Sequence, residues 1–289
     1  YFNGESFSEA EIRAALRTNV MDGSIVPMSM GSNVLCQGVY TLLDDIVKYM
    51  PSPENRELAG IDLKSNEIFQ ANYDFSKPKS AYIFKTIVDP FIGKYSLIKV
   101  CSGVFKNDDT IYNDEKEVEE KINKLYVMQG SKPIEVKELH AGDIGAIAKL
   151  TAARTGNTLS TKARIIRYGK AEISTPYTYK RYRVKNKGDV DKVSQALQKM
   201  RHEDQTLWVV NDGENRQTLI YGMGDLHLEV VASRLLNEYK VEIELDEPKV
   251  AYRETIRKKS DVEYKYKKQS GGHGQYGHVK MRFESSGDL

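Results

Sequence analysis

The chain has 289 residues, 40% of them hydrophobic, and a formal net charge of +2. This length suggests two or three domains, and no apolar run approaches the ~20 residues that span a bilayer, so we expect no membrane partner. The two cysteines, Cys36 and Cys101, lie far apart, which argues against a disulfide framework and fits a reducing cytosol.

Charge is distributed unevenly along the chain. Residues 1–70 carry five Lys or Arg against ten Asp or Glu, whereas residues 162–187 carry nine against one and residues 250–289 carry nine against five. Such asymmetry indicates a polyanionic partner for the two basic segments, although a single run of charge is more often solvated surface.

The first 55 residues predict two helices with a short strand between them. Ser8 is a suitable N-cap for a helix over 8–18, and apolar residues at helical spacing predict a second helix over 38–50. Residues 26–30 form an apolar run that predicts a strand. Helix, strand and helix in this order are typical of the end of an α/β domain. Residues 56–79 are polar and predict a linker.

From residue 80 the pattern changes to short strands separated by turn residues, which predicts a β-barrel or sandwich over 80–170. The expected strands cover 81–88, 95–104, 110–112, 122–129 and 144–150. The charged stretch 115–121 is interpreted as a solvated loop.

Residues 171–248 predict the order β-α-β-β-α-β, which is the ferredoxin-like split motif. Asp225 is a plausible N-cap for the second helix of this motif. We also expect Gly224 to lie in a tight turn with unusual backbone angles, so that Gly224→Val would be destabilising.

Residues 249–289 predict a strand, a glycine-rich loop over 269–277 and a second strand. Gly271, Gly272 and Gly274 leave the backbone of this loop bare and able to approach a partner closely. Lys265, Lys267 and Lys268 precede the loop, and tyrosines are interleaved with them. Positive charge and aromatic rings around a glycine loop suit a nucleic-acid backbone, although such a pattern alone more often marks a plain turn.

No spacing in the chain identifies a catalytic centre. Gly93 and Lys94 resemble the end of a phosphate-binding loop, but Val88 and Tyr95 occupy the positions that need Gly and Ser or Thr. His273 and His278 have no third ligand near them in the sequence. We therefore predict no catalytic residue and no metal site.

The order of residues 269–277 closely resembles the tip loop of the fourth domain of bacterial elongation factor G. The resemblance continues through Gly31-Ser32-Asn33, Gly156-Asn157-Thr158-Leu159 and the run Gly222-Met223-Gly224-Asp225-Leu226. It implies a multidomain α/β and β fold: the end of a P-loop GTPase α/β domain over 1–55, a translation-factor β-barrel over 80–170, a ferredoxin-like α+β domain over 171–248, and the start of a fourth, α+β domain over 249–289. Asn33, Asn157, Gln205 and Asp225 depart from the family pattern, which indicates a divergent paralogue.

The resemblance also implies a function. The family binds GTP with magnesium, hydrolyses GTP and promotes translocation of tRNA and mRNA on the cytoplasmic ribosome. Because no P-loop is found, we expect a ribosome-binding fragment of a longer protein, one that has no GTP or magnesium site of its own.

The resemblance and the charge pattern together name the candidate site residues. Gly31, Ser32 and Asn33 would contact the guanine base. The residues expected to contact the ribosome and tRNA are Lys265, Lys267, Lys268, Ser270, Gly271, Gly272, His273, Gly274 and Gln275. Arg164, Arg167, Arg181 and Arg183 are candidates for contact with ribosomal RNA.

Two alternatives remain open. A ribosomal-protection GTPase shares the first three domains but has a different tip loop, so the loop at 270–275 argues against it. A non-translational RNA-binding module would be favoured if the full-length protein lacked a P-loop.

Overall fold

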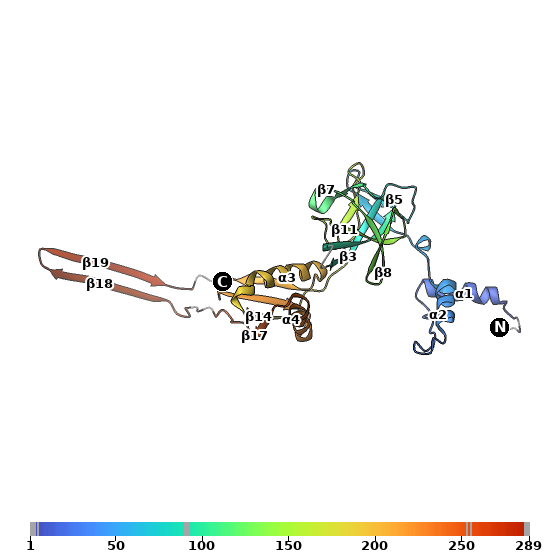
Figure 1. Cartoon of the computed structure of the whole chain (residues 1–289). Coiled ribbons are helices and arrows are strands. Elements are labelled where there is room, and N and C mark those ends of the chain that lie inside the picture. The colour runs from blue at the N-terminus through green and yellow to red at the C-terminus, as the bar shows by residue number, and fades with distance from the viewer. Residues whose placement is uncertain (1–3, 5, 90–92, 253, 255, 286–289) are drawn as a thin grey trace. The chain divides into compact units, whose positions relative to one another are not determined.

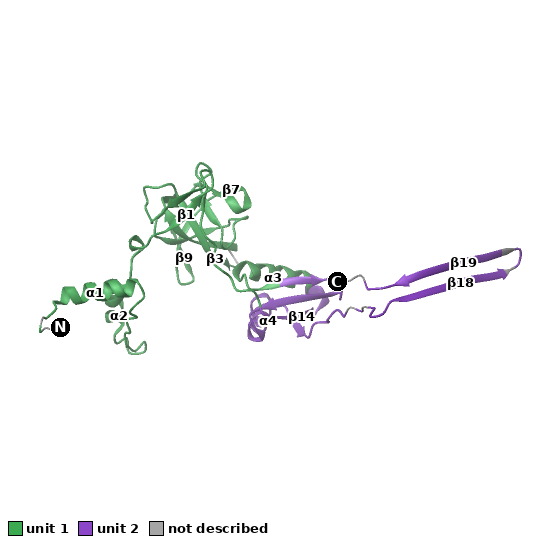
Figure 2. Cartoon of the chain, turned by 180° about the vertical axis from the view of Figure 1, so that it is seen from behind, with its two compact units in different colours: residues 1–176, 190–208 green, residues 177–189, 209–289 purple. Residues whose placement is uncertain are grey.

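The computed structural model describes residues 4, 6–89, 93–252, 254 and 256–285, without the side chains of Ser270 and His273. Clustering of contacts divides the chain into two compact units, residues 1–176 with 190–208 and residues 177–189 with 209–289 (Figure 2). Among the described helices, none is both long and apolar enough to cross a membrane.

The N-terminal segment forms two helices, as expected (Figure 1). Helix α1 (Glu9–Met21) begins with a capping box, in which the Ser8 hydroxyl accepts from the Glu11 amide and Glu11 accepts from the Ser8 amide. Helix α2 (Val39–Tyr49) follows Gly38, and a short 3₁₀ turn, η1, spans Pro53–Asn55.

The strand expected over 26–30 is not formed. Met28 and Met30 are 93% and 95% exposed, and no neighbouring strand pairs with this stretch among the described residues. An apolar run becomes a buried strand only where other strands supply its hydrogen bonds and cover its faces.

The β-rich body of the first unit is built on an eight-stranded sheet in the order β7-β6-β12-β3-β4-β11-β8-β9, with a separate pair of β10 and β5. The described strands of this body all pair in antiparallel orientation. The strands are β3 (Ser80–Asp89), β4 (Gly93–Ser102), β5 (Val104–Lys106), β6 (Thr110–Asn113), β7 (Val118–Lys121), β8 (Leu125–Gln129), β9 (Lys132–Val136), β10 (Glu138–His140), β11 (Ile144–Ala148) and β12 (Thr158–Ser160).

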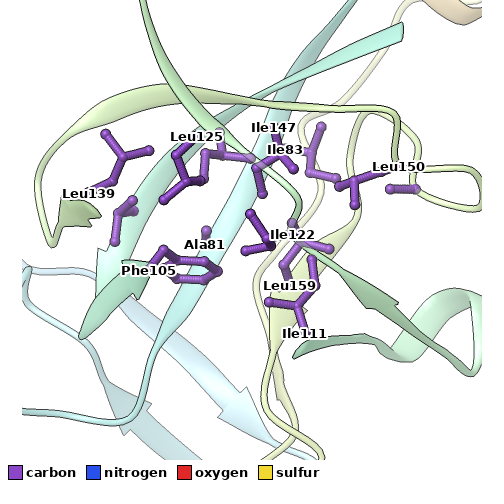
Figure 3. Packing of buried hydrophobic residues seen from close by; sticks show 13 residues of the cluster. Ala81, Ile83, Phe105, Ile111, Ile122, Leu125, Leu139, Ile147, Leu150 and Leu159 are labelled. Atoms are coloured by element: carbon purple, nitrogen blue, oxygen red, sulfur yellow. The ribbon is translucent and has the colours of Figure 1, made fainter. Parts of the chain in front are cut away.

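An apolar cluster of 13 buried residues packs between the strands of this body. Figure 3 shows Phe105, Leu125, Ile147 and Leu159 pointing toward one another from different strands. Each of these side chains is fully buried. Burial of a large aliphatic or aromatic side chain contributes roughly 1.5–3 kcal/mol, so this cluster makes a substantial apolar contribution to the stability of the body.

Two segments expected to be irregular form strands. Strands β1 (Ala59–Asp62) and β2 (Glu67–Gln70) lie within the expected linker 56–79 and make a three-stranded sheet with β13 (Ile166–Arg167). The expected loop 115–121 contains a 3₁₀ turn, η2 (Asp114–Lys116), and strand β7. Strand β1 has a distant partner in β13 and a local one in β2, whereas β7 pairs with the adjacent β6 in a local hairpin. Pairing, rather than apolar alternation, determines that these segments are strands.

The β-α-β-β-α-β order predicted for residues 171–248 is confirmed. It runs β14 (Thr178–Val184), a 3₁₀ turn η3 (Lys187–Asp189), α3 (Val190–Glu203), β15 (Trp208–Asp212), β16 (Gln217–Gly222), α4 (Asp225–Tyr239) and β17 (Ile243–Asp246). The sheet order β15-β16-β14-β17 places the first and third strands in the centre, as in a ferredoxin-like fold.

Helix α3 belongs to the first unit by its contacts (Figure 2). The Val88 amide of β3 donates to the Glu203 carboxylate at 2.8 Å. The Gln205 side-chain amide, just beyond the helix, donates to the Thr155 carbonyl at 2.9 Å. These two bonds fix the end of α3 to the β-rich body.

The C-terminal segment is a long hairpin of β18 (Ser260–Ser270) and β19 (His273–Phe283), seen in Figure 1 as a two-stranded ribbon. Pairing continues without a break from Ser260 opposite Phe283 to Ser270 opposite His273. Only Gly271 and Gly272 remain for the turn. The loop expected over 269–277 is therefore wrong in length, because most of its residues belong to the two strands.

The strand-to-helix turn before α4 corrects two expectations. The N-cap is Gly224 rather than Asp225, and its φ of 173° is extended backbone that any residue adopts. The glycine that the packing requires is Gly222, where a Cβ would lie 2.8 Å from Leu228 Cδ2 and 3.0 Å from His227 Nδ1.

Gly222→Ala is therefore expected to destabilise the second unit by about 1–3 kcal/mol, because the buried Leu228 must move to admit a methyl group. Gly224→Ala is the matched control, since nothing lies within 4 Å of its Cβ position. Thermal unfolding of both variants measures the difference. Equal melting temperatures would show that Leu228 repacks freely.

Candidate nucleic-acid interface

The hairpin of β18 and β19 has two chemically different faces. Residues paired directly across an antiparallel ladder point to the same side, and the side alternates at each position. The register places Glu263, Lys265, Lys267, Tyr276, His278 and Lys280 on one face, which we name the charged face. The apolar face carries Val262, Tyr264, Tyr266, Val279, Met281 and Phe283, each between 41% and 69% exposed.

Glu263 lies within ion-pair distance of Lys265, His278 and Lys280 on the charged face, away from the turn. Its Oε1 lies 2.6 Å from His278 Nε2 and 3.6 Å from the Lys265 ammonium. Its Oε2 lies 3.2 Å from the Lys280 ammonium. Lys267 and Lys268, closer to the turn, form no ion pair with another residue that the structure describes. The hairpin lysines that have no ion-pair partner among the described residues therefore lie next to its tip.

The tip itself is almost bare backbone. Gly271 has a φ of 79°, the left-handed region that favours glycine. Gly272 and Gly274 have open space around their Cβ positions. Gln275 is exposed and pairs with Lys268. The backbones of Ser270 and His273 close the ladder, whereas their side chains lie outside the described residues.

The three residues expected at a guanine base lie together. Gly31, Ser32 and Asn33 line a cavity of about 220 Å³ before α2. The Ser32 amide donates to the Gln37 carbonyl at 3.0 Å, so it is not available to a ligand. The Asn33 amide has no acceptor among the described residues. The segment therefore combines a small cavity with one backbone N–H that has no acceptor among the described residues.

The arginines expected to contact RNA are already paired with carboxylates. In the first unit, Arg164 Nε donates to Asp62 at 2.8 Å and the guanidinium lies 4.8 Å from the centre of the Phe69 ring. Arg167 Nε donates to Asp114 at 2.9 Å. Both arginines are about half exposed. They connect the β13 segment to its neighbours, which is a structural task that charge counting does not reveal.

The second pair of arginines belongs to the other unit. Arg183 Nε donates to Asp246 at 2.6 Å, and the Arg181 guanidinium lies 3.3 Å from the same carboxylate. The Arg183 hydrogen bond, with a contribution from Arg181, holds the pKa of Asp246 below its usual range. The structure therefore divides the four candidate arginines between two units and does not gather them in one patch within either.

One feature of the second unit was not singled out by the sequence analysis. Tyr179 of β14 and Tyr221 of β16 are paired across the sheet, with ring centroids 4.9 Å apart and planes at 23°. The only sequence signal was the alternation of β14, which does not show that two aromatic rings from separate strands meet.

Three successive parts of the chain match domains of one known protein family, in the same order. Residues 78–162 match the family model described as elongation factor G domain 2, residues 173–247 match elongation factor G domain III, and residues 248–288 match elongation factor G domain IV. The chain belongs to the elongation factor G family. A crystal structure of a protein from Thermus thermophilus is 30% identical with a TM-score of 0.73, and the match covers 98% of this chain. It covers 40% of that protein, so the chain spans less than half of the length of this relative.

Elongation factor G is a translation elongation factor, and two departures of this chain from the family pattern have structural uses. Asn157 Oδ1 accepts from the Arg154 amide at 2.9 Å and from Asn113 Nδ2 at 3.1 Å. The Gln205 side-chain amide donates a hydrogen bond to the Thr155 carbonyl, and an ionised carboxylate at this position could not donate one. Both side chains hold the loop before β12 in place.

The pair of Asp246 and Arg183 predicts a specific pH dependence. Because the folded-state pKa of Asp246 is lowered, its stabilising contribution is present above its ordinary pKa of about 3.9 and is lost as the pH falls through the lowered value. In unfolding measured from pH 6 to pH 2, Asp246→Asn and Arg183→Ala should each show a shallower loss of stability than the parent. A slope equal to that of the parent in both variants would contradict this prediction.

The turn of the hairpin gives a second prediction. Gly271→Ala should weaken the turn by about 1–2 kcal/mol, because an L-residue with a Cβ is strained at positive φ. Amide hydrogen exchange in β18 and β19 should accelerate about 5- to 30-fold. Gly272→Ala, with open space at its Cβ and no left-handed φ, serves as the control and should exchange at nearly the parent rate.

Proposed function

We propose that this chain is the ribosome-binding part of an elongation factor G that couples GTP hydrolysis to the translocation of tRNA and mRNA. The observation that carries the proposal is the β18–β19 hairpin. Its continuous ladder ends in a two-glycine turn next to two lysines that lack ion-pair partners among the described residues. We propose that this tip reaches the decoding site of the ribosome.

The parts of the tip have separate physical tasks in this proposal. Lys267 and Lys268 attract phosphate groups without reading sequence, so they raise affinity rather than specificity. Gly271 and Gly272 expose backbone with no side chain, which permits close approach to an RNA surface. Gln275 supplies a side chain that can donate and accept hydrogen bonds beside the turn.

GTP and magnesium are proposed for the longer protein. The Asn33 amide and the cavity that it lines support contact with the guanine base. Phosphoryl transfer to water is stabilised by a phosphate-binding loop and magnesium. Within the described part of the chain, no group of three His, Cys, Asp or Glu residues is placed to hold a metal ion. The partners we propose are ribosomal RNA, ribosomal proteins and the tRNA–mRNA complex, in the cytoplasm.

The test uses the full-length protein that we propose to contain this chain. Replacing Lys267 and Lys268 together with Ala should weaken ribosome binding, lower the slope of log affinity against log salt by about 2, and slow single-turnover translocation. GTP hydrolysis should stay near the parent rate, because the tip contributes nothing to the nucleotide chemistry. Lys280→Ala is the control, since Glu263 already pairs with that lysine.

Two outcomes would overturn the proposal. If translocation of the double variant equals that of the parent, the tip has no part in moving tRNA. If the double variant and Lys280→Ala reduce salt dependence equally, position near the turn is irrelevant and the lysines act only as general surface charge.

A further inference from the structure

The sheet of the second unit has one face that α4 does not cover. Alternation along β14 and β16 puts Ile220 and Gly222 on the side of α4, where Gly222 lies against Leu228. Tyr179, Arg181 and Arg183 of β14 therefore point to the opposite side, together with Tyr221 of β16. Tyr179 is 42% exposed on this face.

The two tyrosines occupy the two central strands of the sheet. They are directly opposite in the register, and their rings stack at 4.9 Å. A stacked aromatic pair on a sheet is a fixed, flat π surface, and such surfaces bind unpaired nucleotide bases by stacking. Side chains locked against each other lose little freedom when a third ring is added to the stack.

A pocket of about 420 Å³ lies on the same unit beside the arginines of β14. Its lining includes three arginines, Arg181 and Arg183 of β14 and Arg216 just before β16. The lining contains one carboxylate, Asp212. The oxygens of Asp212 are occupied, because they accept from the Glu214 and Asn215 amides and from the side chains of Asn215 and Gln217. Asp246 and Glu244 already pair with Arg183, and Asp246 also pairs with Arg181, so the donors left for a ligand are Arg216 and the second edge of Arg181.

The donors of this pocket are not all used. Arg181 Nε is buried without a hydrogen-bond acceptor in the described part of the chain. Arg216 is exposed and forms no ion pair with a described residue. A guanidinium group with N–H donors that lack acceptors can bind a phosphate, because two phosphate oxygens accept parallel hydrogen bonds from one arginine. Arg181 is two residues from Tyr179 along β14, a separation of about 7 Å.

We propose that this face of the β14–β16 sheet binds single-stranded RNA, with an unpaired base stacked on the Tyr179–Tyr221 pair and an adjacent phosphate in the arginine pocket. The site is separate from the hairpin and does not depend on the proposed role of the tip. An acidic peptide would satisfy the arginines but would have no need of the tyrosines, which is why the aromatic pair identifies a nucleic acid.

The test measures fluorescence anisotropy of a labelled, eight-nucleotide single-stranded RNA titrated with the 289-residue chain at low salt. Tyr179→Leu, which keeps apolar volume and removes the ring, should weaken binding about 5- to 100-fold. Tyr179→Phe should bind like the parent. Tyr252→Leu is the matched control, because Tyr252 is 90% exposed and lies outside the sheet. Arg216→Ala should lower the salt slope by about 0.7.

Four results of this titration would overturn the proposal. Parent-level binding by Tyr179→Leu, equal competition by duplex RNA, or a preference for DNA of the same sequence would each overturn it, as would tighter binding of an acidic peptide than of RNA. Should Tyr179→Leu fail to fold, photocrosslinking of the parent chain to RNA containing 4-thiouridine decides the question. A crosslink in the peptide that holds Tyr179 supports the site, and crosslinks confined to the hairpin contradict it.

Discussion

The first unit depends on the pairing of strand β3 along both of its edges. One edge pairs with β4, which follows directly, and the other pairs with β12, far later in the chain. The end of β3 also donates a hydrogen bond to Glu203, 115 residues away. Because buried backbone groups must find partners, this one strand connects the β-rich body, its closing segment and helix α3.

Local patterns predicted the elements that depend on local contacts. The N-cap at Ser8, the apolar spacing of α2 and the β-α-β-β-α-β order are visible in neighbouring residues, and the structure confirms them. The errors at 26–30, 56–79 and 115–121 all concern strand pairing. Strand β1 is completed by the distant β13, and β7 pairs with the neighbouring β6 although its residues are mostly charged. The apolar run 26–30 has no partner strand among the described residues.

The candidate site was predicted in part for the same reason. The order of residues around Gly271 located the hairpin, but glycines at 274 and 277 made the loop look longer than the ladder permits. A count of charges along the chain cannot distinguish Arg164 from Lys267 as a candidate for contact with RNA. In the structure a carboxylate already opposes the arginine, whereas no described residue pairs with the lysine. Available charge is a property of contacts, and it decides which basic residues can serve a polyanionic partner.

The length of the hairpin has a mechanical consequence. Each of its strands has 11 residues, which at ~3.4 Å per residue makes a lever of about 37 Å between root and turn. A rotation of about 5° at the root displaces the turn by roughly 3 Å, which is the length of a hydrogen bond. The position of the glycine turn is therefore set at the root of the hairpin, where a small angular error is multiplied, and not by the turn itself.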